Sequence, residues 1–249
     1  MHLRRNIKLI LEYDGSSFHG WQIQPDKISI QQTLEGVLYK IVNHPVKLTA
    51  AGRTDAGVHA KGQVVNFHTT SKIPMNNLIR AINSIIAPDI VILSAEIMPY
   101  KFNARRDPVS RWYRYRILNR SLPSVFESHY SFHYRYLLNI NKMRFALDYL
   151  LGKHDFSAFN ASPDLTKNPV RTILKYSIER ENDILNIDII ANGFFHHMVR
   201  TIVGTLIEIG RGKMDSQRMQ TILISKDRKK AGPNVPPYGL FLMGVEFKK

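Results

Sequence analysis

The sequence predicts an α/β protein of the α+β type, built from two related ferredoxin-like halves with mixed or antiparallel sheets. Strand and helix patterns follow one another in the order β-α-β-β-α-β, and the second half repeats that order. The chain has 249 residues, of which 44% are hydrophobic, enough to bury one large core or two small ones. We place the halves at residues 1–104 and 105–249, and we expect a site in the cleft between them.

The first half contains the complete element order once. Alternating apolar residues over 7–13 predict the opening strand. Ser29, followed three residues later by Gln32, is typical of a helix start, and an apolar stripe with helical spacing comes after it. The other predicted elements are strands at 46–51, 63–68 and 90–95, and a helix marked by Leu78, Ile82 and Ile85.

The second half follows the same order with one addition. Strand patterns at 172–180 and 184–191 are separated by Glu181-Asn182-Asp183, which indicates a hairpin. The further predictions are a strand at 111–118, a helix at 143–150, a helix at 199–206 that ends at Gly210, a short inserted helix near 216–224 and a closing strand at 240–247.

Charge and composition limit the function classes. The formal net charge is +15, which favours a polyanionic partner, most simply nucleic acid. There is no cysteine, so disulfides, zinc–thiolate sites, iron–sulfur clusters and a cysteine nucleophile are excluded. No segment has the apolar length of a membrane-spanning helix or a signal peptide, so we expect a soluble, cytoplasmic protein without membrane contact. Phosphate-binding loops, Rossmann fingerprints and hydrolase elbows are absent, and the acids are isolated rather than clustered.

A carboxylate between two glycines is the most informative feature. Asp55 lies between Gly52 and Gly57, with Arg53 two residues before it. Glycines allow a sharp turn and the close approach of a ligand, so the loop can hold Asp55 at the mouth of a cleft. The alternative is a turn aspartate that hydrogen-bonds to its own backbone.

Basic and aromatic residues alternate after the first half. Residues 101–120 contain seven basic residues and one acid. In a strand, Tyr113 and Tyr115 share one face, while Arg114 and Arg116 lie on the other. Such a mixture offers an aromatic surface to an unstacked base and cations to phosphates. The alternative is a strand with tyrosines in the core and a solvated basic face.

A third segment joins two histidines to a helix. His196 and His197 are adjacent and make a poor metal-binding pair, so packing and helix capping are the simpler interpretation. Arg200 lies at the border of the apolar stripe that follows. It is either a surface arginine with a buried stem or a buried arginine paired with a carboxylate.

Taken together, these motifs resemble the TruA family of tRNA pseudouridine synthases. The most specific one is Gly52-Arg53-Thr54-Asp55-Ala56-Gly57-Val58-His59. The others, in chain order, are Tyr13-Asp14-Gly15, Gly20-Trp21-Gln22, Gln63-Val64-Val65, Phe102-Asn103-Ala104-Arg105, Arg111-Trp112-Tyr113-Arg114-Tyr115, His154-Asp155-Phe156, His197-Met198-Val199-Arg200, Val203-Gly204 and Gly239-Leu240. They cover nearly the whole chain.

The resemblance implies an isomerase that converts uridine to pseudouridine at positions 38, 39 and 40 of the tRNA anticodon arm. It implies a homodimer that needs no metal and no organic cofactor. Asp55 matches the catalytic aspartate, Tyr113 the tyrosine that packs on the target base, Arg200 the basic partner of the aspartate, and Arg53 an arginine linked to base flipping. Asn66 and Trp112 stand where we expect a histidine and a basic residue.

Two other functions remain possible at this stage. One is a non-catalytic RNA-binding protein with ferredoxin-like halves, and the other is a pseudouridine synthase of the same superfamily that modifies a different site.

Overall fold

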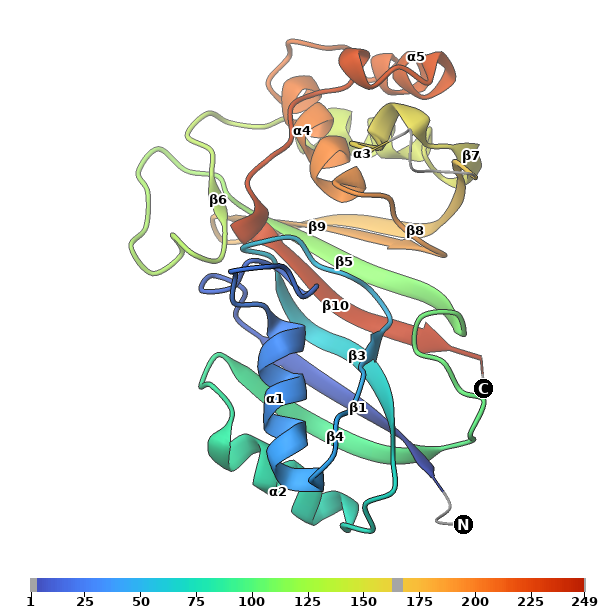
Figure 1. The fold of residues 1–249 in the computed structure, drawn as a ribbon. Coiled ribbons are helices and arrows are strands. Elements are labelled where there is room, and N and C mark those ends of the chain that lie inside the picture. Colours follow the sequence, from blue (N-terminus) through green and yellow to red (C-terminus); the bar gives the residue numbers. More distant parts are fainter. Residues whose placement is uncertain (1–3, 163–167, 249) are drawn as a thin grey trace. The chain divides into compact units, whose positions relative to one another are not determined.

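The computed structural model describes residues 4–162 and 168–248 (Figure 1). The chain forms two compact units, one made of Met1–Val109 with Phe241–Lys249 and the other of Ser110–Leu240. None of the helices within the described ranges has the length and apolar character needed to cross a membrane.

The N-terminal unit is a twisted sheet with two helices on one face (Figure 1). Its strands run in the order β4-β1-β3, antiparallel throughout, and β3 also pairs with β2 and, in parallel, with β10. The elements are β1 (Arg5–Tyr13), α1 (Ile30–Val42), β2 (Thr49–Ala50), β3 (His59–Thr69), α2 (Met75–Ile85), β4 (Ile90–Met98) and β10 (Leu240–Phe247). The β-α-β-β-α-β order predicted for the first half is confirmed.

Helix α1 has the cap and the buried apolar face that its sequence pattern predicts. Ser29 occupies the N-cap position and its hydroxyl accepts a hydrogen bond from the Gln32 backbone N–H at 3.3 Å. Leu34 and Leu38, one turn apart, are completely buried. Facing strand residues such as Ile7 and Leu9 are buried too, so the core of this unit lies between its helices and its sheet.

The C-terminal unit has the sheet order β5-β9-β8-β7, with all three pairings antiparallel and β6 paired in parallel to β5. Its helices α3, α4 and α5 lie on one side of the sheet (Figure 1). The elements are β5 (Pro108–Leu118), β6 (Phe132–His133), α3 (Ile140–Asp148), β7 (Gly152–Asp155), β8 (Val170–Glu181), β9 (Ile184–Ala191), α4 (Met198–Gly210) and α5 (Arg218–Ser225). Asn182 has a φ of 54° and makes the predicted turn between β8 and β9.

Helix α4 is the most buried helix element of this unit, and its backbone packs directly against a neighbouring segment. A Cβ on Gly204 would lie 1.8 Å from the carbonyl oxygen of Pro233. Next to it, the Thr205 hydroxyl accepts a hydrogen bond from the Gly232 N–H at 2.9 Å. Only glycine permits this approach, and the contacts fix residues 232–235 beside residues 200–205 of α4.

The grouping of the last strand differs from the division expected at residues 104 and 105. We expected β10 in the C-terminal half, yet Phe241–Lys249 belongs to the N-terminal unit. Phe241 pairs with His59 and Leu242 with Ala60, and the Phe241 ring stacks on the imidazole of His59 at 4.6 Å. Strand periodicity predicts a strand but carries no information on which sheet receives it.

Candidate active site

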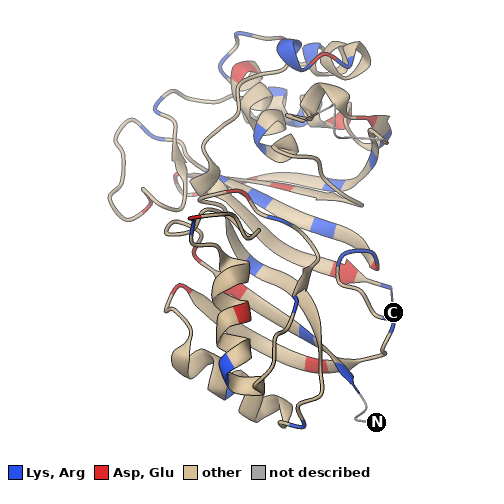
Figure 2. Ribbon diagram, in the orientation of Figure 1, with Lys and Arg blue, Asp and Glu red and all other residues tan. Residues whose placement is uncertain are grey.

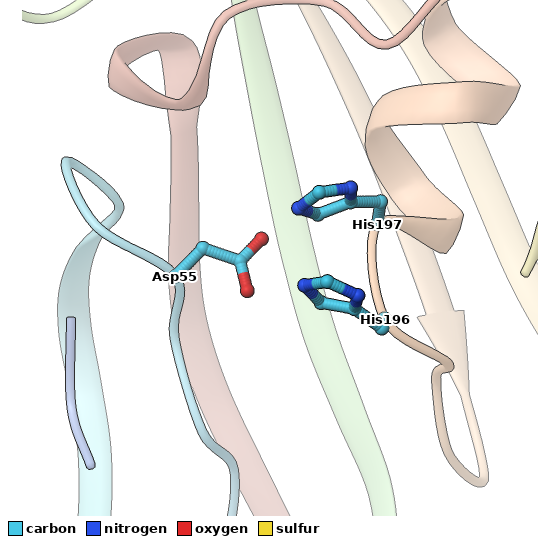
Figure 3. Close-up of side chains that lie close together, drawn as sticks. All are labelled: Asp55, His196 and His197. Carbon is cyan, nitrogen blue, oxygen red and sulfur yellow. The ribbon is translucent and has the colours of Figure 1, made fainter. Parts of the chain in front are cut away.

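Asp55 lies on the loop between β2 and β3 and is half-buried (Figure 3). The backbone around it is held by buried side chains. The hydroxyls of Tyr13 and Thr54 share a hydrogen bond of 2.8 Å, and both side chains are buried. Two residues before Thr54, the carbonyl oxygen of Gly52 accepts a hydrogen bond from Nε2 of Gln63 at 2.8 Å. The loop therefore presents Asp55 from a fixed backbone, as a catalytic carboxylate requires.

Glycines make this loop geometry possible. Gly57 has a φ of 75°, a left-handed conformation that side chains rarely adopt. Gly20 has a φ of 88°, and a Cβ there would come within 2.8 Å of the Thr54 carbonyl oxygen. That oxygen accepts a hydrogen bond from the Trp21 N–H at 2.9 Å. The Gly-Trp motif and the Asp55 loop are thus parts of one packed structure.

Burial keeps the phenol of Tyr13 neutral. It raises the pKa of Tyr13 to about 12, because the hydrogen bonds with Thr54 and Gln63 only partly offset the loss of hydration. Partial desolvation lowers the pKa of Arg53, and the positive charge of Arg105 adds to this effect. Two guanidinium groups therefore lie near each other at the Asp55 loop, which favours an anionic ligand there.

His59, the last residue of the specific motif, anchors the end of the loop. It is 1% exposed, and its Nδ1 accepts a hydrogen bond from the Gly15 N–H at 3.1 Å. The same nitrogen lies 3.1 Å from a carboxylate oxygen of Asp14. The specific motif contains His59 but assigns it no role. Its contacts show that His59 joins β1 and β3 beneath the loop.

Tyr113 lies on β5 and is 8% exposed. Its ring meets that of Phe194 edge to face, with centroids 5.0 Å apart. Tyr115, on the same face, is completely buried, and its hydroxyl donates to the Pro236 carbonyl oxygen at 2.8 Å. The core interpretation of the tyrosines is therefore correct for Tyr115.

The arginines of β5 have partners within their own unit. Arg114 makes a two-point contact with Asp188, with both N–O distances 2.9 Å, and Trp112 donates to the same carboxylate at 2.7 Å. Arg116 donates to Glu127 at 3.2 Å. These charges hold strands and loops together, so they are not simply a solvated basic face.

Arg200 is half-buried in the first turns of α4. Its Nε donates a hydrogen bond of 2.8 Å to the carbonyl oxygen of Val235, in the segment that Gly204 admits to the helix. Burial raises the pKa of Tyr115, and the charge of Arg200 opposes that rise, so the guanidinium lies near this phenol. The backbone contact orients Arg200, whereas a freely solvated arginine has no fixed orientation.

The two histidines before α4 adopt a conformation that the sequence did not predict. His197 has a φ of 60°, which is uncommon for residues other than glycine and clusters at functional sites. The rings of His196 and His197 lie 3.8 Å apart (Figure 3). His197 occupies the N-cap position, but within the described chain its side chain makes no capping bond to the helix. It bonds to Asn234 at 3.0 Å instead, so the capping prediction is wrong.

The predicted site residues divide between the units. Arg53 and Asp55 lie on one loop of the N-terminal unit, whereas Tyr113 and Arg200 lie on β5 and α4 of the C-terminal unit. The pairing of Arg200 with Asp55 stays a prediction.

Comparison with known proteins identifies the family. A sequence model of the family described as tRNA pseudouridine synthase matches residues 9–105 and 146–248. The chain belongs to the tRNA pseudouridine synthase family. It is 44% identical over 241 residues to tRNA pseudouridine synthase A of Thermoanaerobacter sp. (strain X514), which covers 97% of this chain and 99% of that protein. It is 45% identical over the same length to tRNA pseudouridine synthase A 2 of Clostridium perfringens, with the same coverage of both chains.

These findings confirm the resemblance to tRNA pseudouridine synthases, and with it an isomerase that acts on tRNA. They do not favour the non-catalytic RNA-binding alternative. Arg53, Asp55 and Arg200 lie inside the segments that the family model matches, whereas Tyr113 lies outside both. The role of Tyr113 therefore depends more heavily on its position in the fold.

Proposed function

We propose that this tRNA pseudouridine synthase converts uridine to pseudouridine at positions 38, 39 and 40 of the anticodon arm, with Asp55 as the catalytic carboxylate. The family match carries the proposal, because it spans most of the chain and includes the Asp55 loop. The buried contacts of Thr54 and Gln63 support it, since they fix the backbone that leads into Asp55.

The reaction is an isomerisation in which no atom of the uracil or ribose skeleton is lost. The bond between C1′ and N1 breaks, the uracil turns, and a bond between C1′ and C5 forms. N1 gains a proton, and C5 releases one to solvent. Cleavage of the glycosidic bond develops positive charge on the sugar, and a carboxylate can stabilise or capture that charge. One ionised aspartate therefore suffices.

The remaining residues are assigned by what their groups can do. Tyr113 offers an aromatic face to the uracil once the uridine has left its stack. Arg200 is oriented by Val235 and supplies the positive charge that keeps a carboxylate ionised. Arg53 and the neighbouring Arg105 bind the phosphates that flank the flipped nucleotide.

We further propose that the enzyme acts in the cytoplasm, where tRNA is its substrate, and that it functions as a homodimer. The resemblance to the TruA family supports both statements.

The test replaces Asp55 with Asn. Asparagine is nearly the size of aspartate and hydrogen-bonds in similar ways, so a purely structural turn survives the change. It cannot carry the negative charge, so we expect folding and tRNA binding to persist while pseudouridine formation is lost by at least about 1,000-fold. Tritium release from tRNA labelled at C5 of uridine measures the reaction.

Asp26→Asn is the matched control, because Asp26 is exposed and its φ of 56° suits asparagine. It should retain the parental rate and melting temperature. Parental tritium release from folded Asp55→Asn protein would refute the assignment of Asp55, and absence of pseudouridine at positions 38–40 with the parent enzyme would refute the assigned target.

A further inference from the structure

A cavity of about 520 Å³ opens in the N-terminal unit, away from the Asp55 loop in the sequence. Its lining residues come from the end of β4, the segment that joins β4 to β5, the start of β5 and the end of β10. The residues that matter for its chemistry are Met98, Phe102, Arg106, Val109, Phe247 and Lys248. Its volume falls within the range of roughly 300–1,000 Å³ typical of pockets for small ligands.

One wall of the cavity is aromatic and packs against buried residues. The rings of Phe102 and Phe247 lie 5.2 Å apart at an angle of 46°. Both pack against a small buried cluster that includes Val64 of β3 and Ala104 of the segment between β4 and β5. Both rings are also only partly buried, so part of their surface remains available to another planar group.

The rim of the cavity is basic. Arg106 and Lys248 line it and are exposed. Asp107 also lines the cavity, and its carboxylate accepts a hydrogen bond from the Asn103 backbone N–H at 2.7 Å and so closes the turn that precedes β5. Figure 2 shows the basic residues along this turn. Two cations beside an aromatic wall match a phosphate attached to a base.

Two buried asparagines hold this wall in place. We call residues 99–107 the strap. Asn6, 1% exposed, donates from its side chain to the Phe102 carbonyl oxygen at 2.8 Å. Asn66, 3% exposed, donates to Asn6 Oδ1 at 2.8 Å and accepts from the Ala104 N–H at 2.9 Å. Because both amides are buried and satisfied, the strap and its side of the cavity are preorganised.

We propose that this cavity binds one unstacked nucleotide of the tRNA substrate, outside the nucleotide that is isomerised. The base packs on the Phe102–Phe247 wall, and its phosphate contacts Arg106 and Lys248. This inference rests on the proposed function, since it extends the contact between enzyme and tRNA. The net charge of +15 supports RNA as the occupant, because a surplus of this size favours a polyanionic partner and the two cations at the rim match its phosphate.

The experiment measures tRNA affinity across a series of salt concentrations. The first variant combines Arg106→Gln with Lys248→Gln, and its matched control combines Lys72→Gln with Arg80→Gln, two exposed cations elsewhere in the same unit. The first should raise Kd about tenfold or more and make the log–log salt slope less negative by about one, since one phosphate loses its cations. The control should change Kd less than about threefold.

A second variant tests the aromatic wall. Phe247→Leu keeps an apolar side chain but removes the ring, so Kd should rise at least about fivefold while the salt slope stays unchanged. Equal Kd values for the Arg106/Lys248 pair and its control would overturn the proposal. A Kd change that appears only where sedimentation shows a lost dimer would also overturn it, since the occupant would then be a second copy of the chain. Pseudouridine formation by the parent enzyme keeps these outcomes separate from failure of the proposed function.

Discussion

At the scale of single residues, Tyr113 allows stacking to be separated from hydrogen bonding. Tyr113→Phe retains the ring and the edge-to-face contact with Phe194, so we expect near-parental tRNA affinity. Tyr113→Ala removes a stacking surface whose contribution is on the order of 1–3 kcal/mol per base, so single-turnover rates should fall about tenfold to 100-fold. Rapid-quench assays at saturating enzyme measure the rate.

Stability has to be followed alongside, because Tyr113 is 8% exposed and its removal leaves space beside Phe194. Phe194→Leu disturbs the same ring contact without touching the proposed stacking surface and serves as the control. A parental single-turnover rate for folded Tyr113→Ala protein would contradict a role in stacking.

The sequence singles out Asp55 as a candidate functional residue because a carboxylate between glycines is a local pattern. The fixed backbone around it was not predictable, since Tyr13, Trp21 and Gln63 approach from distant parts of the chain. The left-handed conformation of His197 was equally hidden. Nothing in the sequence Phe-Phe-His-His-Met distinguishes an N-cap histidine that caps its helix from one that turns to Asn234.

At the scale of elements, the strap depends on Asn66. Replacement of Asn66 by Ala leaves the Ala104 N–H and the Asn6 side-chain oxygen buried without this partner. Each buried group left unsatisfied costs about 1–3 kcal/mol, so for the two groups together the free energy of unfolding should fall by about 2–6 kcal/mol. Urea unfolding followed by circular dichroism measures the loss.

Asn76→Ala provides the comparison, because Asn76 is exposed in the first turn of α2. It should change the free energy of unfolding by less than about 0.5 kcal/mol. An equal effect of the two substitutions would show that the Asn6–Asn66 network does not stabilise the unit. The same network explains why Asn66 functions where we expected histidine, since an amide both donates and accepts here.

Elements with strong local signals were predicted best. Helix α1 has its Ser29 cap and its apolar stripe, and the β8–β9 hairpin has its three-residue turn signal. The strand predicted at 46–51 shrinks to Thr49–Ala50, because only these residues pair with Asn66 and Val65 of β3. Pairing and sheet membership depend on distant partners, and β10 was assigned to the other half for the same reason.

At the scale of the whole molecule, the net charge matters most, because electrostatic interactions act over longer distances than packing or hydrogen bonds. Several cations are already engaged by acids, including Arg114 with Asp188 and Lys8 with Glu96, the latter at 2.5 Å. Within each pair the positive and negative charges cancel, so the pairs leave the net surplus of +15 unchanged. Figure 2 shows Lys and Arg distributed over strands, helices and loops of both units. The surplus of positive charge therefore attracts tRNA in two ways, through the summed electric field of the protein and through single contacts.

That surplus predicts strongly salt-dependent binding of tRNA. Binding releases the counterions condensed on the phosphates that the protein neutralises, so the logarithm of the association constant falls linearly with the logarithm of salt concentration. If about five to eight phosphates are neutralised, the slope should lie between about −4 and −7. Filter binding or fluorescence anisotropy with unmodified tRNA, from low to moderate potassium chloride at constant magnesium, measures the slope.

Melting curves of the tRNA alone, under the same conditions, separate changes in RNA folding from changes in binding. Asp55→Asn should show a nearly parental slope, because we assign the phosphate contacts to the basic surface and not to the carboxylate that we propose as catalytic. A slope near zero would contradict electrostatic recognition and would leave shape and stacking as the dominant sources of affinity.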